Sequence, residues 1–190
     1  MIEFFQHLNS LHPLSPEATS GLLKVIRAKE LRRGQVWLQE GAVCDKLTFV
    51  VKGLLKLYFE TGTKELIVQF AIENEFILSA HSYLSRKPSA YSIRSIEQTV
   101  VVYLLSSDWD HLLAKHPELI SHYLMTASKQ VKKMEEHLSL LLLPPKDRFE
   151  KLLDNGSWLI DGRRVTDKLL AAYLGVRATT VCEWRKGKRL

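Results

Sequence analysis

The chain has 190 residues, enough for one or two domains with cores of their own. No run approaches the roughly 18 consecutive apolar residues of a membrane span, so we expect no membrane association. The formal net charge is +6, and residues 144–190 hold 11 Lys and Arg against 6 Asp and Glu. A compact basic segment at the end of a near-neutral chain predicts a polyanionic partner for that segment.

The two cysteines argue against cofactor chemistry. Cys44 and Cys182 lie far apart and show neither CxxC nor histidine-pair spacing, so we expect no metal, cluster, other cofactor or disulfide. The N-terminal sequence MIEFFQHLNS has no basic segment followed by an apolar core, so it does not read as a secretory signal. A cytoplasmic location is the default expectation.

Residues 1–28 are expected to be helical and amphipathic, with Ser15 capping a helix that starts at Pro16. After them the pattern changes to short β segments, and such strands at regular spacing favour a sandwich or small barrel. The predicted strands are 35–39, 47–51, 54–60, 65–72, 92–96 and 100–105, with turns at Gly34, Gly41, Gly53, Gly62 and Asn74. A brief helix at 79–85 interrupts them, where either a ligand or a plain connection would fit.

A short helix is predicted at 107–115, and a long one follows between Pro117 and Pro144. Along the long helix one apolar stripe repeats every 4 and 3 residues without a break. Such a heptad repeat is typical of a helix that pairs with one partner, and we expect that partner to be a second copy of the chain. Packing against a neighbouring sheet is the alternative. The stripe consists of Ile120, Leu124, Ala127, Val131, Met134, Leu138 and Leu141.

The last 25 residues predict a helix-turn-helix, which is preceded by a helix at 146–154. Thr166 or Asp167 can cap a first helix, and Gly175 stands where a tight turn needs positive φ. A second helix is predicted from about Arg177 to Lys186, with Val181 and Trp184 on its inner side. The basic enrichment of this segment makes the second helix a candidate recognition helix for double-stranded DNA.

The side chains of this helix divide by chemistry. Arg can donate to guanine, Glu can accept from cytosine N4, and Thr can contact phosphate or a thymine methyl group. Basic residues further along are better suited to phosphates, which position a protein without reading sequence. The predicted base readers are Arg177, Thr179, Thr180 and Glu183; the predicted phosphate contacts are Arg185, Lys186, Lys188 and Arg189, with Arg163, Arg164 and Lys168 as further candidates.

This order of parts resembles the Crp/Fnr superfamily of bacterial transcription regulators, in particular its compact Bacteroidetes-type members. The resemblance rests on GAVCDKLTFVVKGLLKLYF, FILSAHSYLSRKPSAYSIRSIEQTVVVYLL, DWDHLLAKHPEL, DRFEKLL and LLAAYLGVRATTVCEWRK. It implies an α+β fold: a cyclic-nucleotide-binding-like β-roll (a double-stranded β-helix) at 1–116, a dimerisation helix at 117–143 and a helix-turn-helix domain at 144–190. It also implies a homodimer on a roughly two-fold symmetric operator, with RNA polymerase as a further partner.

The chain departs from the pattern of the family's cyclic-nucleotide binders. These hold the phosphate with a glutamate and an Arg-Ser or Arg-Thr pair, and the matching positions here are Ser79 and the pair Ser89 and Ala90. Because the cation is missing, with Arg86 and Lys87 the nearest substitutes, we expect an unknown small-molecule effector other than cyclic AMP. The expected effector pocket comprises Ser79, His81, Ser82, Ser89, Ala90 and Tyr91.

Two other sensing modes and three other functions stand as alternatives. Two cysteines cannot ligate the iron–sulfur cluster of the oxygen-sensing branch, and a haem ligand from His81 or His7 would rest on a lone histidine. The alternatives to a ligand-controlled regulator are an effector-independent DNA binder with an empty β-roll, and a protein-binding module whose helix-turn-helix no longer binds DNA. A cupin-like enzyme needs clustered histidines, and the β region offers His81 alone. We therefore expect no catalytic residues.

Overall fold

The structure, a computed structural model, describes residues 1–62, 64–155, 157–160 and 164–188. The residues gather into two compact units, Met1–Leu57 with Phe70–Val131, and Tyr58–Gln69 with Lys132–Leu190. The domain boundaries expected near residues 117 and 144 stay a prediction.

The expected N-terminal helical region consists of two helices, α1 (Ile2–Leu11) and α2 (Pro16–Val25). The predicted cap at Ser15 is confirmed, since its hydroxyl accepts a hydrogen bond from the Ala18 N–H at 3.1 Å. Proline at position 13 separates the helices because it cannot donate to a preceding turn. On α1, Phe4 is buried and its ring meets the rings of Phe49 and Phe76 edge-on.

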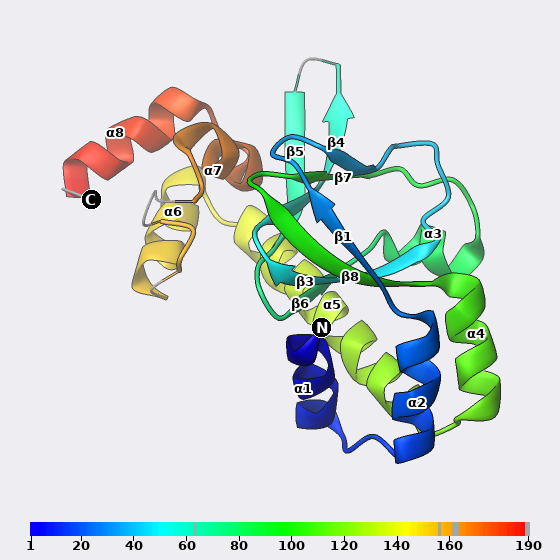
Figure 1. Cartoon of the computed structure of the whole chain (residues 1–190). Helices are drawn as coiled ribbons and strands as arrows, with labels where there is room; N and C mark the ends of the chain where they lie inside the picture. The colour runs from blue at the N-terminus through cyan, green and yellow to red at the C-terminus, as the bar shows by residue number, and fades with distance from the viewer. Residues whose placement is uncertain (63, 156, 161–163, 189–190) are drawn as a thin grey trace. The chain divides into compact units, whose positions relative to one another are not determined.

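The β region forms two four-stranded sheets within the described residues (Figure 1). One has the order β1-β8-β3-β6, with β1 at Arg27–Leu31, β8 at Thr99–Leu105, β3 at Lys46–Lys52 and β6 at Glu75–Ile77. The other has the order β2-β7-β4-β5, with β2 at Val36–Leu38, β7 at Ser92–Ser95, β4 at Leu55–Thr61 and β5 at Lys64–Ala71. The pairs β1–β8, β3–β8, β3–β6 and β2–β7 are antiparallel.

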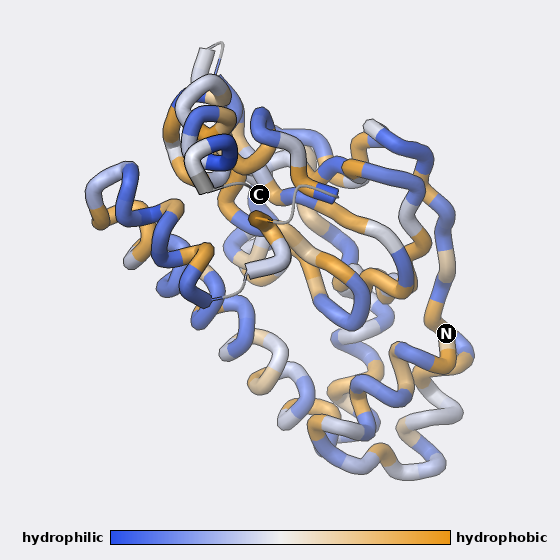
Figure 2. Tube along the Cα trace, turned by 90° about the vertical axis from the view of Figure 1, so that its left-hand side faces the viewer, coloured by the Kyte–Doolittle hydropathy of each residue, from blue (hydrophilic) through white to orange (hydrophobic). Residues whose placement is uncertain are grey.

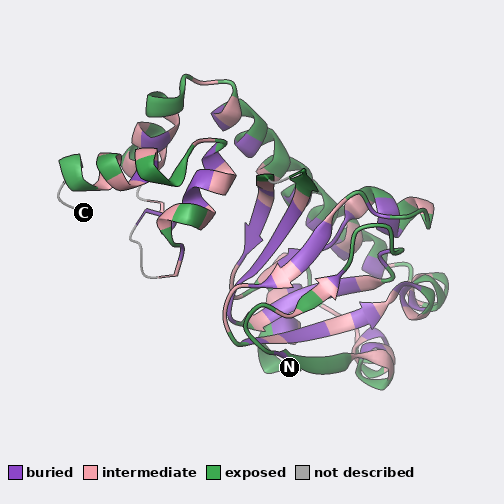
Figure 3. Ribbon diagram, turned by 90° about the horizontal axis from the view of Figure 1, so that it is seen from above, coloured by how far each residue is buried: buried purple, intermediate pink, exposed green. Residues whose placement is uncertain are grey.

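All six predicted strands are confirmed, but β1 and β6 were missed. Both are edge strands; β1 is exposed along four of its five residues and β6 is only three residues long, so neither shows a clear alternation. The predicted turns at Gly34, Gly41, Gly53, Gly62 and Asn74 all have positive φ. Figure 3 shows that buried residues concentrate in the strands, and Figure 2 shows short apolar stretches alternating with hydrophilic ones along the chain.

Two short helices accompany the strands, and a long one follows them. The predicted brief helix is α3 (Ala80–Ser85), and α4 (Ser106–Lys115) follows β8. The long helix α5 extends over Leu119–Leu141. It begins two residues after the expected Pro117 because a turn closes first, with the Leu119 N–H donating to the carbonyl of His116 at 3.0 Å.

Three helices complete the chain, α6 (Pro145–Asp154), α7 (Asp167–Leu174) and α8 (Ala178–Lys188). Pro145 occupies the first turn of α6, where its missing N–H costs nothing. On α6, Phe149 is almost fully buried, and Leu159 and Ile160 of the following connection are buried too. These apolar side chains give the helical part of the second unit a core of its own.

Candidate functional site

A tight turn joins α7 to α8. The hydroxyl of Thr166 caps α7 by accepting from the Leu169 N–H at 3.4 Å. Gly175 ends the helix in the left-handed region at φ 68°, and the Val176 N–H donates back to the Ala171 carbonyl at 3.0 Å. Glycine suits this position because a Cβ is disfavoured at such a φ. The predicted two helices and their turn are therefore confirmed as local structure.

The inner face of α8 is apolar, as predicted. Val181 is fully buried, together with Leu170 and Leu174 of α7. The ring of Trp184 lies against that of Phe149 from α6, with centroids 5.4 Å apart and planes inclined at 45°. Because these contacts hold one side of α8 against α6 and α7, its opposite side is open to a ligand.

Several of the residues predicted to meet DNA lie on the open side of α8 or just before it. Arg177, Thr179, Glu183 and Lys186 are exposed, and Thr180 is half-buried. Arg164 is half-buried and Lys168 exposed. The side chain of Lys188 and the residues Arg163 and Arg189 lie outside the described part of the chain.

Arg185 differs from its basic neighbours. Its side chain is only 14% exposed and forms an ion pair with Asp167, 3.0 Å from Nη1 to Oδ1. The phosphate contact expected for Arg185 stays a prediction. In this structure the guanidinium group is already paired with Asp167.

The apolar stripe of α5 lies open in the single chain. Its members Ile120, Leu124, Val131, Met134 and Leu138 are all at least 45% exposed. Ala127 is exposed as well, and Leu141 is half-buried. The stripe therefore does not pack on the chain's own sheets in the described structure, and its second-copy partner stays a prediction.

A different face of α5 is the buried one, and the sequence analysis missed it. It is polar: His122, Thr126, Gln130 and His137 are all buried. Within the first unit, Gln130 Nε2 donates to the Phe76 carbonyl at 2.9 Å, and His122 Nε2 donates to the His12 carbonyl at 2.8 Å. The 4, 4 and 7 residue spacing was a detectable signal, but polar residues on a helix are usually taken as solvent-facing.

The expected effector residues come together only in part. Ser82 is buried; its hydroxyl accepts from the Cys44 N–H at 2.9 Å and donates to the Lys87 carbonyl at 2.5 Å. The buried Ser89 hydroxyl donates to the Tyr91 carbonyl and accepts from its N–H. Ser79 is buried where α3 begins, Tyr91 is half-buried, and His81 and Ala90 are exposed. The hydroxyls of Ser82 and Ser89 are thus engaged in holding the loop.

Arg86, one of the two nearest substitutes for the missing arginine, is engaged in other contacts. Arg86 ends α3 in the left-handed region and forms an ion pair with Asp110 of α4, 2.8 Å between nitrogen and oxygen. Its guanidinium carbon also lies 5.0 Å from the centre of the Tyr83 ring. Nearby, burial raises the pKa of the Cys44 thiol, so this cysteine is a poor nucleophile.

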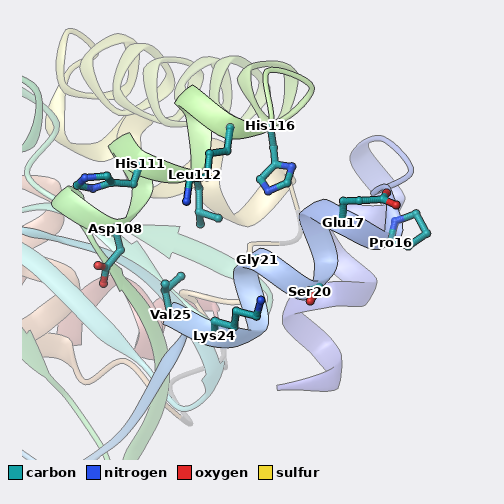
Figure 4. Close-up of a pocket in the computed structure, with 11 residues that line it drawn as sticks. Pro16, Glu17, Ser20, Gly21, Lys24, Val25, Asp108, His111, Leu112 and His116 are labelled. Carbon is teal, nitrogen blue, oxygen red and sulfur yellow. The ribbon is translucent and has the colours of Figure 1, made fainter.

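A groove of about 560 Å³ lies between α2 and α4 (Figure 4), and no pattern in the sequence had pointed to it. It narrows at Gly21, where an added Cβ would come within 2.9 Å of Leu112 and 3.2 Å of His116. Both signs of charge line it, Lys24 and Lys115 together with Glu17 and Asp108, and the imidazoles of His111 and His116 lie in the same lining. Asp108 already forms an ion pair with Arg27 at 2.6 Å.

The described residues show neither a metal site nor a membrane span. No group of three or more histidine, cysteine, aspartate or glutamate side chains there is placed to hold a metal ion. In the same part of the chain, no helix combines the length and apolarity needed to cross a bilayer.

Sequence comparison identifies a domain family and a curated protein that are similar to this chain. Residues 28–116 match the family described as "Cyclic nucleotide-binding domain". A curated relative, the HTH-type transcriptional regulator Cmr of Mycobacterium tuberculosis, is 24% identical over 172 residues, which cover 89% of this chain and 69% of that protein.

Solved structures agree in fold. The c-di-GMP-responsive global regulator CLP of Xanthomonas campestris superposes with a TM-score of 0.73 at 15% identity, covering 92% of both chains. A CooA mutant from Carboxydothermus hydrogenoformans gives a TM-score of 0.72 at 13% identity, covering 89% of this chain and 78% of that one. FixK2 of Bradyrhizobium japonicum gives 0.71 at 16%, covering 84% and 82%.

The β-roll, the long helix and the C-terminal helices share the fold of CLP, CooA and FixK2, and residues 28–116 match the cyclic nucleotide-binding domain. The chain is similar in fold to these structures and, over 172 residues, similar in sequence to the curated transcriptional regulator. The resemblance inferred from the sequence motifs is thereby confirmed at the level of the fold and of the cyclic nucleotide-binding domain.

Proposed function

We propose that the protein is a homodimeric DNA-binding regulator that inserts the outer face of α8 into the major groove. The observation that carries the proposal is the division of α8 into two faces. Val181 is fully buried on one side, while Thr179, Glu183 and Lys186 are exposed on the other, and Arg177 is exposed just before the helix. A helix held by an apolar face and presenting short polar and charged side chains suits base-edge readout.

The surrounding charge supports the same partner. Residues 144–190 carry an excess of 5 basic over acidic residues, counted over the whole sequence. Phosphate contacts by such residues draw DNA in and position the helix without reading bases. The curated relative is named as a helix-turn-helix transcriptional regulator, which agrees with this role.

The exposed stripe of α5 supports the dimer. Leu124, Val131 and Leu138 are 61%, 54% and 60% exposed. Full burial of each side chain would stabilise a dimer by roughly 1–3 kcal/mol of free energy. A second copy can cover the stripe with its own, since an isologous interface uses one patch twice. Two copies then present two recognition helices to half-sites about one helical turn apart.

The input to the regulator is proposed to be something other than a cyclic nucleotide. The positions matching the phosphate-binding pair are Ser89 and Ala90, and the Ser89 hydroxyl is engaged with Tyr91. Arg86 is paired with Asp110. An effector would act by favouring one of two arrangements of the dimer.

Selection of bound fragments from a random pool of DNA duplexes tests the proposal. We expect a two-fold symmetric consensus and an affinity that falls steeply as salt rises, because phosphate contacts release counterions. An asymmetric consensus would contradict the symmetric dimer. An affinity that does not respond to salt, or no binding in low salt, would contradict the DNA role.

A further inference from the structure

Arg185 stands in a basic run of the sequence, but its side chain does not share the environment of that run. It is 14% exposed, whereas the neighbouring Glu183 and Lys186 are exposed to solvent. Since residues 183 and 186 flank it on α8, burial of Arg185 reflects the direction of its side chain. It points toward the protein and away from the outer face of the helix.

The guanidinium group meets three partners. Nη1 lies 3.0 Å from Oδ1 of Asp167, in the first turn of α7. Nη2 donates to the carbonyl oxygens of Leu159 and Val165, each at 3.3 Å. A planar fork of donors suits such a set, and a lysine ammonium would not span it.

These contacts hold the C-terminal half of α8 in place. The near end of the helix follows the turn at Gly175, and Val181 packs between the two ends. The bond to Asp167 reaches back to the start of α7, and the carbonyl contacts reach the connection before it. Because α8 is held by contacts at both ends, its angle relative to α7 is defined.

We propose that Arg185, through Asp167, is a positioning residue that sets the angle of the recognition helix and makes no phosphate contact. This rests on the proposed function, that α8 reads DNA. It differs from the assignment suggested by the basic run, and it leaves Lys186 as the exposed cation beside it.

The two roles make opposite predictions for Asp167→Asn. If Arg185 contacts phosphate, removing an acidic partner frees the guanidinium group and removes repulsion, so DNA binding stays equal or becomes tighter. If Arg185 positions α8, the same change loosens the helix, and we expect binding to weaken by roughly tenfold. Arg185→Lys also distinguishes the two roles, because it keeps the positive charge and loses the planar fork of donors. A phosphate contact would largely survive this change, whereas the positioning of α8 would not.

The experiment measures affinity of the full chain for a duplex of about 30 base pairs, selected by the wild-type protein, over a range of salt concentrations. We expect Lys186→Gln to lower the slope of log affinity against log salt by about one for each protomer that contacts the duplex. Arg185→Gln, Arg185→Lys and Asp167→Asn should weaken binding with the slope unchanged. The double change Arg185→Gln with Asp167→Asn should be no worse than either alone.

Circular dichroism at the assay temperature checks that each variant is folded. If Arg185→Gln is unfolded, the milder variant Arg185→Lys takes its place in the comparison. A slope reduced by Arg185→Gln as much as by Lys186→Gln, with wild-type or tighter binding by Asp167→Asn, would overturn the positioning role alone. Failure of the wild-type protein to bind any duplex would overturn the proposed function and the positioning role together.

Discussion

The imidazole of His137 lies stacked on the ring of Tyr173, with centroids 4.0 Å apart and planes inclined at 13°. Its Nε2 donates to the Tyr173 carbonyl oxygen at 2.8 Å, and the backbone of Val68 also hydrogen-bonds the ring. One buried histidine therefore joins α5, α7 and β5 within the second unit. Burial lowers its pKa, and the nearby Arg148 lowers it further, against the raising effect of the two backbone partners.

The lowered pKa of His137 predicts a pH dependence of stability. A base whose folded pKa lies below its unfolded value contributes stability that is present above the ordinary 6.5 and is lost as pH falls through the folded value. We expect the free energy of unfolding of the wild-type protein to decrease below pH 6.5, and His137→Gln to flatten that decrease. Denaturant unfolding across a pH series measures it.

The pH experiment has a matched control. His81 is exposed, so His81→Gln should leave the wild-type pH dependence in place. His7, whose pKa is also lowered, chiefly by burial, contributes with the same sign, so His137→Gln removes part of the effect. An unchanged pH dependence in His137→Gln would show that this ring does not stay neutral in the folded protein.

A charge in the α5 stripe should separate the protomers. We expect Val131→Asp or Leu138→Asp to yield a monomer and to abolish operator binding, since a carboxylate buried in an apolar seam has no partner. Light scattering coupled to size-exclusion chromatography gives the mass. Ser139→Asp places the same charge on an exposed position one residue after Leu138 and should remain dimeric. Normal operator affinity in the first two variants would exclude the stripe as the dimer interface.

Two glycines with positive φ should respond differently to alanine. At Gly53 (φ 106°) a Cβ would come within 2.7 Å of the Thr99 Cα and 2.8 Å of the Gln98 carbonyl oxygen. At Gly34 (φ 80°) it would meet nothing within 4 Å. We expect Gly34→Ala to cost about 1–2 kcal/mol from backbone strain alone and Gly53→Ala about 3 kcal/mol or more. Equal losses in denaturant unfolding would mean that β8 yields readily at Thr99.

Cyclic AMP should leave the protein unchanged. A ligand that binds only the folded state raises the melting temperature, in proportion to the logarithm of its concentration above Kd. Because Ser89 and Ala90 supply no cation for its phosphate, we expect no rise at millimolar-order cyclic AMP. A dose-dependent rise would show that another cation, such as Lys87, holds the phosphate.

Glu183 should contribute to sequence preference. A carboxylate accepts from cytosine N4, whereas an amide can pair with both N6 and N7 of adenine. We expect Glu183→Gln to change the preferred base at one position of each half-site, with a discrimination of about 1–3 kcal/mol. Parallel selections from one random pool reveal the change. Identical consensus sequences would show that Glu183 does not read a base.

Apart from the edge strands β1 and β6, the elements and their order could be predicted from the sequence. Heptad spacing predicted a long helix with one apolar stripe, and positive-φ turns were predicted correctly at Gly175 and at five positions of the β region. These signals are local, since each depends on the spacing of neighbouring residues or on the chemistry of one residue. The family resemblance followed from the same motifs and their order.

Which side chains of a given type form contacts became clear only from the packing of the elements. Arg185 and Lys186 are adjacent cations in the sequence, yet Arg185 is bound to Asp167 and Lys186 is exposed. Arg86 pairs with Asp110, 24 residues away, and Gln130 donates to a carbonyl 54 residues away. Partners this distant are brought together by the packing of the elements, which a residue's charge and spacing along the chain do not specify.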